Sequence, residues 1–340
     1  TGRQQYALVG GAYELGRQNG ASGDSNVYGW VDGQLIIDNF QLTINDTARS
    51  SANGLKGMSI SAVIVQRNWE NDGKDRVLSC GSFEIDDLDA SGGEGRGSAV
   101  VLKGTSLPYA SSVREQKKSK AWENIKLSAI AKEIAKINNM ECMFRADFDP
   151  VYDRKEQVQK SDISFLNGLC YNAGISLKVT DGMIVLFDAA DFEKKPAVRE
   201  IKKGEADVKS WRFNEKSNDT NYSRCRVVYT DPRTGITIEY TYTPRGADPA
   251  GLTLEINEKV NNRNEARNLA MRRFRQKKKD AVTVSFTLVG DVRLFAGITA
   301  DVAGWGYFDG KYIISRGTHS VTGSGYTLQV NLRKTQEGEE

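Results

Sequence analysis

The stretch from Ala121 to Phe192 constrains the fold most strongly, because two helix patterns in it are followed directly by two strand patterns. Apolar residues in its first part recur every three or four positions and so line one side of a helix. These residues are Leu127, Ile130, Ala131, Ile134 and Ile137. Charged residues such as Lys132 and Glu133 face elsewhere, so the pattern predicts one amphipathic helix.

A second helix is predicted to begin at Ser161, whose hydroxyl can accept a hydrogen bond from an N–H group of the first turn. Asp162 is favourable at that end of the helix dipole, and Gly174 stands where a left-handed C-terminal cap is expected. The predicted apolar face consists of Phe165, Leu166, Leu169, Cys170 and Ala173.

Two short strands are predicted after this helix, over Ile175 to Val179 and Met183 to Phe187. Thr180-Asp181-Gly182 separates them, and Asp-Gly favours a tight hairpin turn. The whole stretch therefore predicts a small α+β module.

Part of this module resembles a known family. The run FDPVYDRKEQVQKSDISFLNGLC, residues 148–170, is similar to the signature of the late control protein D family, the baseplate hub proteins of contractile phage tails and phage-tail-like particles. Other family-like segments, in chain order, are CGSFEID (80–86), KSKAWE (118–123), KKPA (194–197), FDGKYII (308–314), THS (318–320) and GYT (325–327). The resemblance covers roughly residues 35 to 335 and does not extend to the Gly-rich residues 1–33.

Strand patterns flank the module on both sides. In the N-terminal third, apolar residues alternate from Met58 to Ile64, and further strands are predicted over Val77 to Ile85 and Ser98 to Lys103. In the C-terminal third, three alternating sets place apolar residues on one sheet face. They are Ile236, Ile238, Tyr240 and Tyr242; Val282, Val284, Phe286 and Leu288; and Tyr326, Leu328, Val330 and Leu332. A sandwich or barrel with one inserted helix, Asn264 to Gln276, is predicted there.

Two polar connectors, Ser111 to Lys120 and Glu193 to Asp207, suggest domain boundaries. The chain of 340 residues is long enough for two or three domains. We expect an N-terminal β domain (1–110), a central α+β module (111–200) and a C-terminal β domain with one basic helix (201–340). The predicted class is α+β and β-rich, and the resemblance implies that the flanking domains are tube-like barrels or sandwiches.

Composition excludes several classes of function. The 47 basic and 44 acidic residues give a formal net charge of +3, so the chain is not a polyelectrolyte directed at nucleic acid or acidic lipid. It contains no apolar run of about 20 residues and no signal-peptide core, so we expect a soluble protein without membrane contact. The four cysteines are scattered without a C-x-x-C pair and are expected to be reduced, buried thiols.

Catalytic chemistry has little support in the sequence. His319, the one histidine, is expected between two C-terminal strands with a structural hydrogen bond, and no nucleophile elbow is present. The cluster Gly92 to Gly97 lacks the Lys-Ser/Thr ending of a phosphate loop and is expected to be a hairpin loop. No catalytic, metal or cofactor residue is therefore predicted, and no cofactor is expected.

A strongly basic segment runs from Arg263 to Lys279, where eight cations and one glutamate give a charge of +7. A stripe of Ala266, Leu269, Ala270 and Phe274 would be buried, which leaves most cations on a solvated face. That face is either simply solvated or contacts a partner or the DNA channel. Because strong phosphate attraction would slow DNA passage, a protein contact is favoured over DNA. The candidate contact residues are Arg267, Arg272, Arg273, Arg275, Lys277 and Lys278.

The resemblance implies a structural hub subunit, located in the baseplate of a virion or tail-like particle and in the host cytoplasm during assembly. A homotrimer would form a central ring that joins the tail tube to the spike, presents six similar units and adapts the symmetry between them. Its further partners would be the tape measure and baseplate wedge proteins, with DNA only as transient cargo. Two alternatives remain: a tail-associated peptidoglycan hydrolase that uses paired carboxylates, and a DNA-contacting channel protein.

Overall fold

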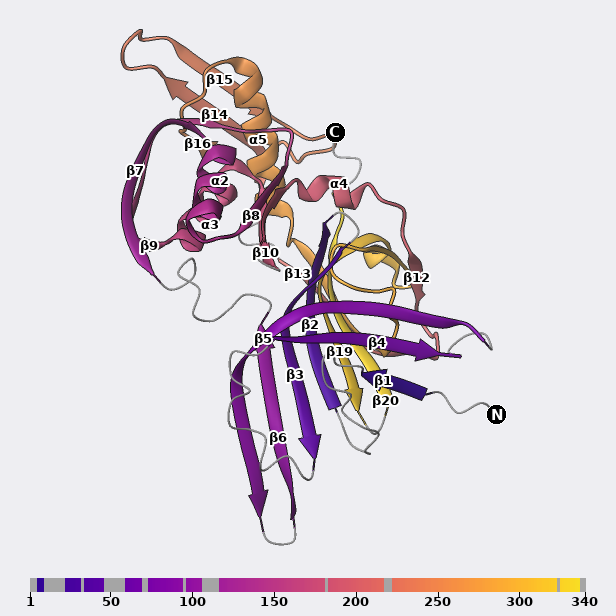
Figure 1. Cartoon of the computed structure of the whole chain (residues 1–340). Coiled ribbons are helices and arrows are strands. Elements are labelled where there is room, and N and C mark those ends of the chain that lie inside the picture. Colours follow the sequence, from indigo (N-terminus) through magenta and orange to yellow (C-terminus); the bar gives the residue numbers. More distant parts are fainter. Residues whose placement is uncertain are drawn as a thin grey trace.

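The computed structural model shows a β-rich α+β protein (Figure 1). It describes residues 5–8, 22–31, 34–45, 59–68, 73–93, 96–105, 116–180, 183–216, 222–322 and 325–336. Within these ranges, no helix is both long enough and apolar enough to cross a membrane. The β-rich α+β class that the sequence predicts is confirmed.

The largest sheet has 12 strands, which come from both ends of the chain. Its N-terminal strands are β1 (Gln5–Leu8), β2 (Ser22–Val31), β3 (Gln34–Asn45), β4 (Ser59–Arg67), β5 (Asp75–Gly93) and β6 (Arg96–Thr105). Its C-terminal strands are β12 (Arg199–Lys202), β13 (Val208–Glu215), β17 (Val282–Val289), β18 (Thr299–Ala303), β19 (Gly310–Thr322) and β20 (Gly325–Lys334). The main order is β1-β4-β5-β6-β3-β2-β19-β20-β17-β13, with β18 and β12 added beside β19.

The two halves of this sheet meet where β2 pairs antiparallel with β19. The halves are also joined by Gln66 on β4, whose side chain is fully buried. Its Nε2 donates to the Gly290 carbonyl at 2.9 Å, and its Oε1 accepts from the Val292 N–H at 3.2 Å. One apolar core includes Phe83 from the N-terminal strands and Val321 from the C-terminal strands. Residues 22–31, from the Gly-rich start of the chain, are thus part of this sheet.

The alternation predicted for β17 and β20 is confirmed. Every second residue is buried from Val284 to Leu288 and from Tyr326 to Leu332, because one face of this part of the sheet packs on apolar cores. Val282, at the start of β17, is half-buried. The buried residues of the two strands are Val284, Phe286, Leu288, Tyr326, Leu328, Val330 and Leu332.

The central module is separate from the large sheet and has its own core. It contains β7 (Lys117–Lys126), α2 (Leu127–Ile137), β8 (Glu141–Arg145), β9 (Val151–Ser161), α3 (Asp162–Ala173), β10 (Ser176–Thr180), β11 (Met183–Phe187) and α4 (Ala189–Glu193). Strands β10, β11 and β8 form one sheet, and β7 pairs with β9.

Both predicted helices are present with the expected ends. The Ser161 hydroxyl accepts from the Ser164 N–H at 3.4 Å, and Gly174 caps α3 at φ +67°. The predicted apolar faces are buried, with one exception. Ile137 is 54% exposed, because it is the last residue of α2 and projects beyond the neighbouring elements. The turn residues 181–182 lie outside the described residues.

Both polar connectors contain a strand, which their charged composition does not indicate. Lys117 to Lys120 belong to β7, and Arg199–Lys202 form β12, which pairs parallel with β18. Backbone pairing needs few apolar side chains, and the one in β12 that is fully buried, Ile201, anchors it in the core.

A second small unit carries the basic helix. It consists of β14 (Tyr222–Thr230), β15 (Thr237–Tyr242), β16 (Leu252–Ile256) and α5 (Arg263–Lys278), with the helix packed on the sheet β15-β14-β16. All four residues of the predicted stripe on α5 are buried. Ile236 is 63% exposed, contrary to prediction, because it lies in the turn before β15. Figure 1 shows this unit beside the central module.

Candidate functional site

Helix α5 is fixed in place at its start and along its buried stripe. The Asn262 side chain accepts from the Glu265 N–H at 2.9 Å, and the Glu265 carboxylate accepts from the Asn261 N–H at 2.8 Å. These reciprocal bonds satisfy backbone donors at the helix N-terminus. They set the rotation of the helix and hence the direction of each predicted contact residue.

Two of the predicted contact residues are largely buried, so a solvated face was the wrong expectation for them. The Arg272 side chain is 14% exposed and forms an ion pair with Asp188 at 2.7 Å. The Arg273 side chain is 16% exposed, forms an ion pair with Glu258 at 3.1 Å and donates to Asn172 at 3.3 Å. Both arginines therefore attach α5 to neighbouring segments of the same chain.

The other four candidates are more accessible. Arg267 and Lys277 are exposed, while Arg275 and Lys278 are half-buried. The Lys278 ammonium lies 5.0 Å from the ring centre of Phe274, and the Arg275 carbonyl accepts from Gln336 Nε2 at 3.2 Å. The structure thus divides the six predicted contact residues into two that hold the fold together and four that remain at or near the surface.

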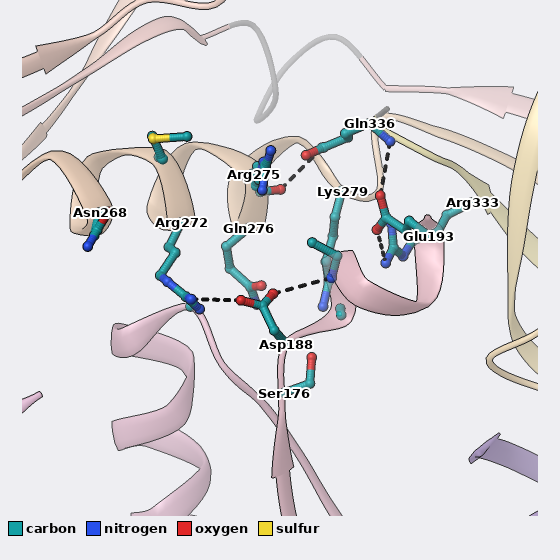
Figure 2. A pocket seen from close by; sticks show the side chains of 14 residues that line it. Ser176, Asp188, Glu193, Asn268, Arg272, Arg275, Gln276, Lys279, Arg333 and Gln336 are labelled. Atoms are coloured by element: carbon teal, nitrogen blue, oxygen red, sulfur yellow. Dashed lines mark hydrogen bonds and ion pairs between the residues drawn. The ribbon is translucent and has the colours of Figure 1, made fainter. Parts of the chain in front are cut away.

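A cavity of about 160 Å³ lies where α5, α4, β10 and the segment after β20 meet; we call it the junction pocket (Figure 2). Its charged lining residues are Asp188, Glu193, Arg272, Arg275, Lys279 and Arg333. Glu193 forms an ion pair with Arg333 at 2.6 Å and accepts from the Gln336 N–H at 3.1 Å. The pocket therefore joins residues that are far apart in the sequence.

Two observations indicate that the carboxylates of the junction pocket do not fully compensate its positive charge. Burial lowers the pKa of Lys279, since removing the ammonium from water disfavours its charged form. The Nη1 atoms of Arg272 and Arg333 are buried and have no hydrogen-bond partner among the described residues. The sequence indicated this pocket only in part. Lys279 belongs to the basic segment, whereas Asp188, Glu193 and Arg333 lie in no recognisable motif.

A second surface feature lies at the edge of the large sheet. Strand β13 is the last strand of the main order, and two aromatic side chains there are unusually exposed, Trp211 at 49% and Tyr307 at 71%. Trp211 packs edge-to-face on Trp305, and Phe213 stacks on Phe308 at 4.6 Å. We call Trp211, Phe213, Trp305, Tyr307 and Phe308 the edge aromatic cluster. Exposed aromatic groups beside an open strand edge are typical of interaction surfaces.

His319 has the structural role that the sequence predicted, although it lies within β19 rather than between strands. It is fully buried, and its Nδ1 is hydrogen-bonded to the Tyr326 hydroxyl at 2.5 Å. Burial lowers its pKa to about 4. A neutral, enclosed imidazole cannot take a proton from a substrate in solution.

The remaining predictions about chemistry concern metals, phosphate and thiols. No cluster of three or more potential metal ligands occurs within the described ranges. β5 and β6 pair as neighbouring antiparallel strands with Gly93 opposite Arg96, so the two ends of the predicted loop 92–97 are strand residues, and residues 94–95 lie outside the described residues. Cys80, Cys170 and Cys225 are buried free thiols whose pKa values burial raises to about 12, and Cys142 is half-buried.

Three solved structures are similar to this chain in fold. A tail protein from Neisseria meningitidis MC58 is 13% identical, with a TM-score of 0.68 and 98% of each chain covered. The 43 kDa tail protein of prophage MuSo2 from Shewanella oneidensis is 15% identical, with a TM-score of 0.64 and the same coverage. An E. coli component of the type VI secretion system is 10% identical, with a TM-score of 0.54, 98% of this chain and 75% of that chain covered.

No curated protein matches the chain in sequence. The family model described as phage tail baseplate hub (GPD) matches residues 37–325, which is most of the chain. This range includes the central module whose sequence resembled the family and most of the strands of the large sheet. The chain therefore belongs to the phage tail baseplate hub (GPD) family.

Proposed function

We propose that the chain is a structural hub subunit that forms a central homotrimeric ring between a tail tube and a spike and adapts the symmetry between them. The observation that carries this proposal is the family match over residues 37–325. Similar tail proteins support its location in the baseplate of a phage or tail-like particle. Assembly in the host cytoplasm and contacts with the tape measure and wedge proteins are part of the same proposal, with DNA passing only as cargo.

The open ends of the large sheet support assembly through subunit contacts. In the described part of the chain, β1 and β13 end the main strand order, so each has a backbone edge without a neighbouring strand. A closed ring removes such edges by pairing or covering them. The edge aromatic cluster supplies apolar area beside β13, and we assign it to the contact with a second copy of the chain.

The three-part division proposed from the sequence has partial structural support. The central module has its own core and sheets, which is consistent with a unit at 111–200 between regions 1–110 and 201–340. The two flanking regions share one sheet through β2 and β19. We propose that this shared sheet, rather than the module, builds the tube-like wall of the ring.

The exposed cations of α5 are proposed to contact an acidic partner protein. Arg267 and Lys277 point to solvent, whereas Arg272 and Arg273 are already paired within the chain. A few exposed charges give weaker phosphate attraction than the full basic run would, and this favours a protein partner over DNA. No catalytic step is part of the proposal, so purified protein should not reduce the turbidity of a peptidoglycan suspension.

Substitution of Trp211 tests the subunit contact. Trp211→Ser should shift the oligomer towards monomer, measured by light scattering coupled to size exclusion, because it removes a large exposed aromatic group beside β13. Ile236→Ser is the matched control, since Ile236 is also exposed but lies in the other small unit. The contact assignment fails if both variants retain the oligomer of the unchanged chain, or if both lose it equally.

A further inference from the structure

The junction pocket is lined by four cationic side chains but by two carboxylates. Arg272 is paired with Asp188 at 2.7 Å, and Arg333 is paired with Glu193 at 2.6 Å. Lys279 also lines the pocket, and the residues that the structure describes give its ammonium no hydrogen bond or ion pair. The pocket therefore has a cation available for an additional anion (Figure 2).

Buried donors without acceptors point to the same conclusion. The Arg333 side chain is only 9% exposed, yet its Nη1 has no hydrogen-bond partner among the described residues. The Arg272 Nη1 is in the same condition. Leaving a charged donor buried and unpaired is costly, and a negatively charged acceptor is the group that compensates for it best. Arg272 on α5 and Arg333 on β20, which carry these donors, both line the junction pocket.

We propose that the junction pocket binds a carboxylate group of an acidic peptide segment. The sequence next to the pocket supports this ligand, because Gln336 lines the cavity and the chain continues as Glu337, Gly338, Glu339 and Glu340. These four residues lie outside the described part. Three of these four residues are acidic, so the chain itself supplies carboxylates directly after Gln336 in the sequence. An acidic segment of another protein has the same chemistry and is the second source.

The position of the pocket gives such binding a consequence. Its walls come from the central module, the α5 unit and the end of the large sheet, so a bound carboxylate would contact all three parts. Burial lowers the Lys279 pKa, and a bound anion would raise it again by favouring the charged form. Binding should therefore make the junction between the three parts more stable.

The test uses a fluorescein-labelled Glu-Gly-Glu-Glu peptide, whose anisotropy is measured against the full chain at low salt. Two proteins are compared: the unchanged chain and a triple variant with Glu337→Gln, Glu339→Gln and Glu340→Gln. Lys279→Met, placed in the triple variant, should weaken binding about tenfold or more, because it removes one charge-assisted contact. Lys277→Met is the matched control on the exposed side of α5 and should leave affinity unchanged.

Each outcome has a defined meaning. Tighter peptide binding by the triple variant than by the unchanged chain supports the site and assigns residues 337–340 as its natural ligand. Equal, saturable binding by both supports the site and assigns a partner protein. The proposal is overturned if the triple variant shows no saturable binding at millimolar peptide, if inorganic phosphate binds and the peptide does not, or if Lys277→Met weakens binding as much as Lys279→Met.

Two precautions keep the result interpretable. Lys279→Met leaves no carboxylate of a described residue without its ion-pair partner, unlike a change at Arg333, and its fold is checked by circular dichroism and urea unfolding. The assay requires no ring, since the isolated chain contains the whole pocket. A monomer that binds the peptide would count against the proposed hub assembly while supporting this site.

Discussion

At the scale of single residues, burial decides what the polar groups of this chain can do. His319 is neutral inside the sheet, the buried cysteines hold their protons, and Arg272 and Arg273 are committed to ion pairs. These are the residue types from which a catalytic or DNA-binding site would be assembled. In this chain the named residues stabilise the fold through these buried contacts.

His319 gives a prediction about pH. Its pKa is lowered from 6.5 to about 4 in the folded state, so as the pH falls the unfolded chain takes up this proton first. Stability is therefore lost as the pH falls from about 6.5 towards 4, by about 3 kcal/mol from this group. A His319→Asn variant should be less stable at pH 7 but should lose less between pH 7 and pH 4.5 in urea unfolding. An unchanged pH dependence in the variant would contradict the assignment.

At the residue scale, the properties that depend on one local stretch of sequence could be predicted. The stripe of α5 and the structural role of His319 were predictable, because helical spacing and the absence of nucleophile motifs are local properties. The burial of Arg272 and Arg273 was not. It depends on Asp188 and Glu258, which come from other elements and have no periodic relation to the helix.

At the scale of elements, α2 and α3 could be predicted because their signals lie within the segment itself. Both helices show apolar spacing, and α3 also has capping residues at its two ends. The strands within the polar connectors were missed for the opposite reason. Strand β12 pairs with β18, about a hundred positions further along the chain, and its sequence is mostly charged. A strand held by long-range pairing needs no alternating pattern of its own.

Gly168 lies within α3 and Gly174 caps its C-terminus, and the two should respond in opposite ways to alanine. Gly168 is exposed within the helix with open space around it, so Gly168→Ala should raise the free energy of unfolding by about 0.5 to 1 kcal/mol. Gly174 has φ +67°, and an added Cβ would lie 2.6 Å from the Arg272 Cβ. Gly174→Ala should therefore cost at least about 1 to 2 kcal/mol. Urea unfolding measures both, and equal effects would contradict the described contact between α3 and α5.

At the scale of the whole molecule, the pairing of β2 with β19 could not be predicted from the sequence. The strand patterns predicted two β regions, but nothing in either pattern indicates that they continue into one sheet. The junction pocket is a similar case, because its lining residues come from positions 174 to 336. Both features depend on how separate units are placed, which local periodicity does not encode.

The placement of the central module outside the large sheet also bears on its role in assembly. Its sequence resembles the family most clearly, yet it lies outside the sheet that we propose builds the wall of the ring. In the proposal, assembly uses the open strand edges and the edge aromatic cluster, of which only Phe308 falls in a family-like segment of the sequence. If this proposal holds, the segment that most resembles the family and the surface that forms the subunit contact are different parts of the molecule.

Electron microscopy of assembled tails that carry a tagged copy of this chain is the decisive test of the proposed hub role. We expect a ring of three copies at the centre of the baseplate, between tube and spike, with the tag at three equivalent positions. A tag at the periphery, a different number of copies, or particles that assemble fully without the chain would contradict it.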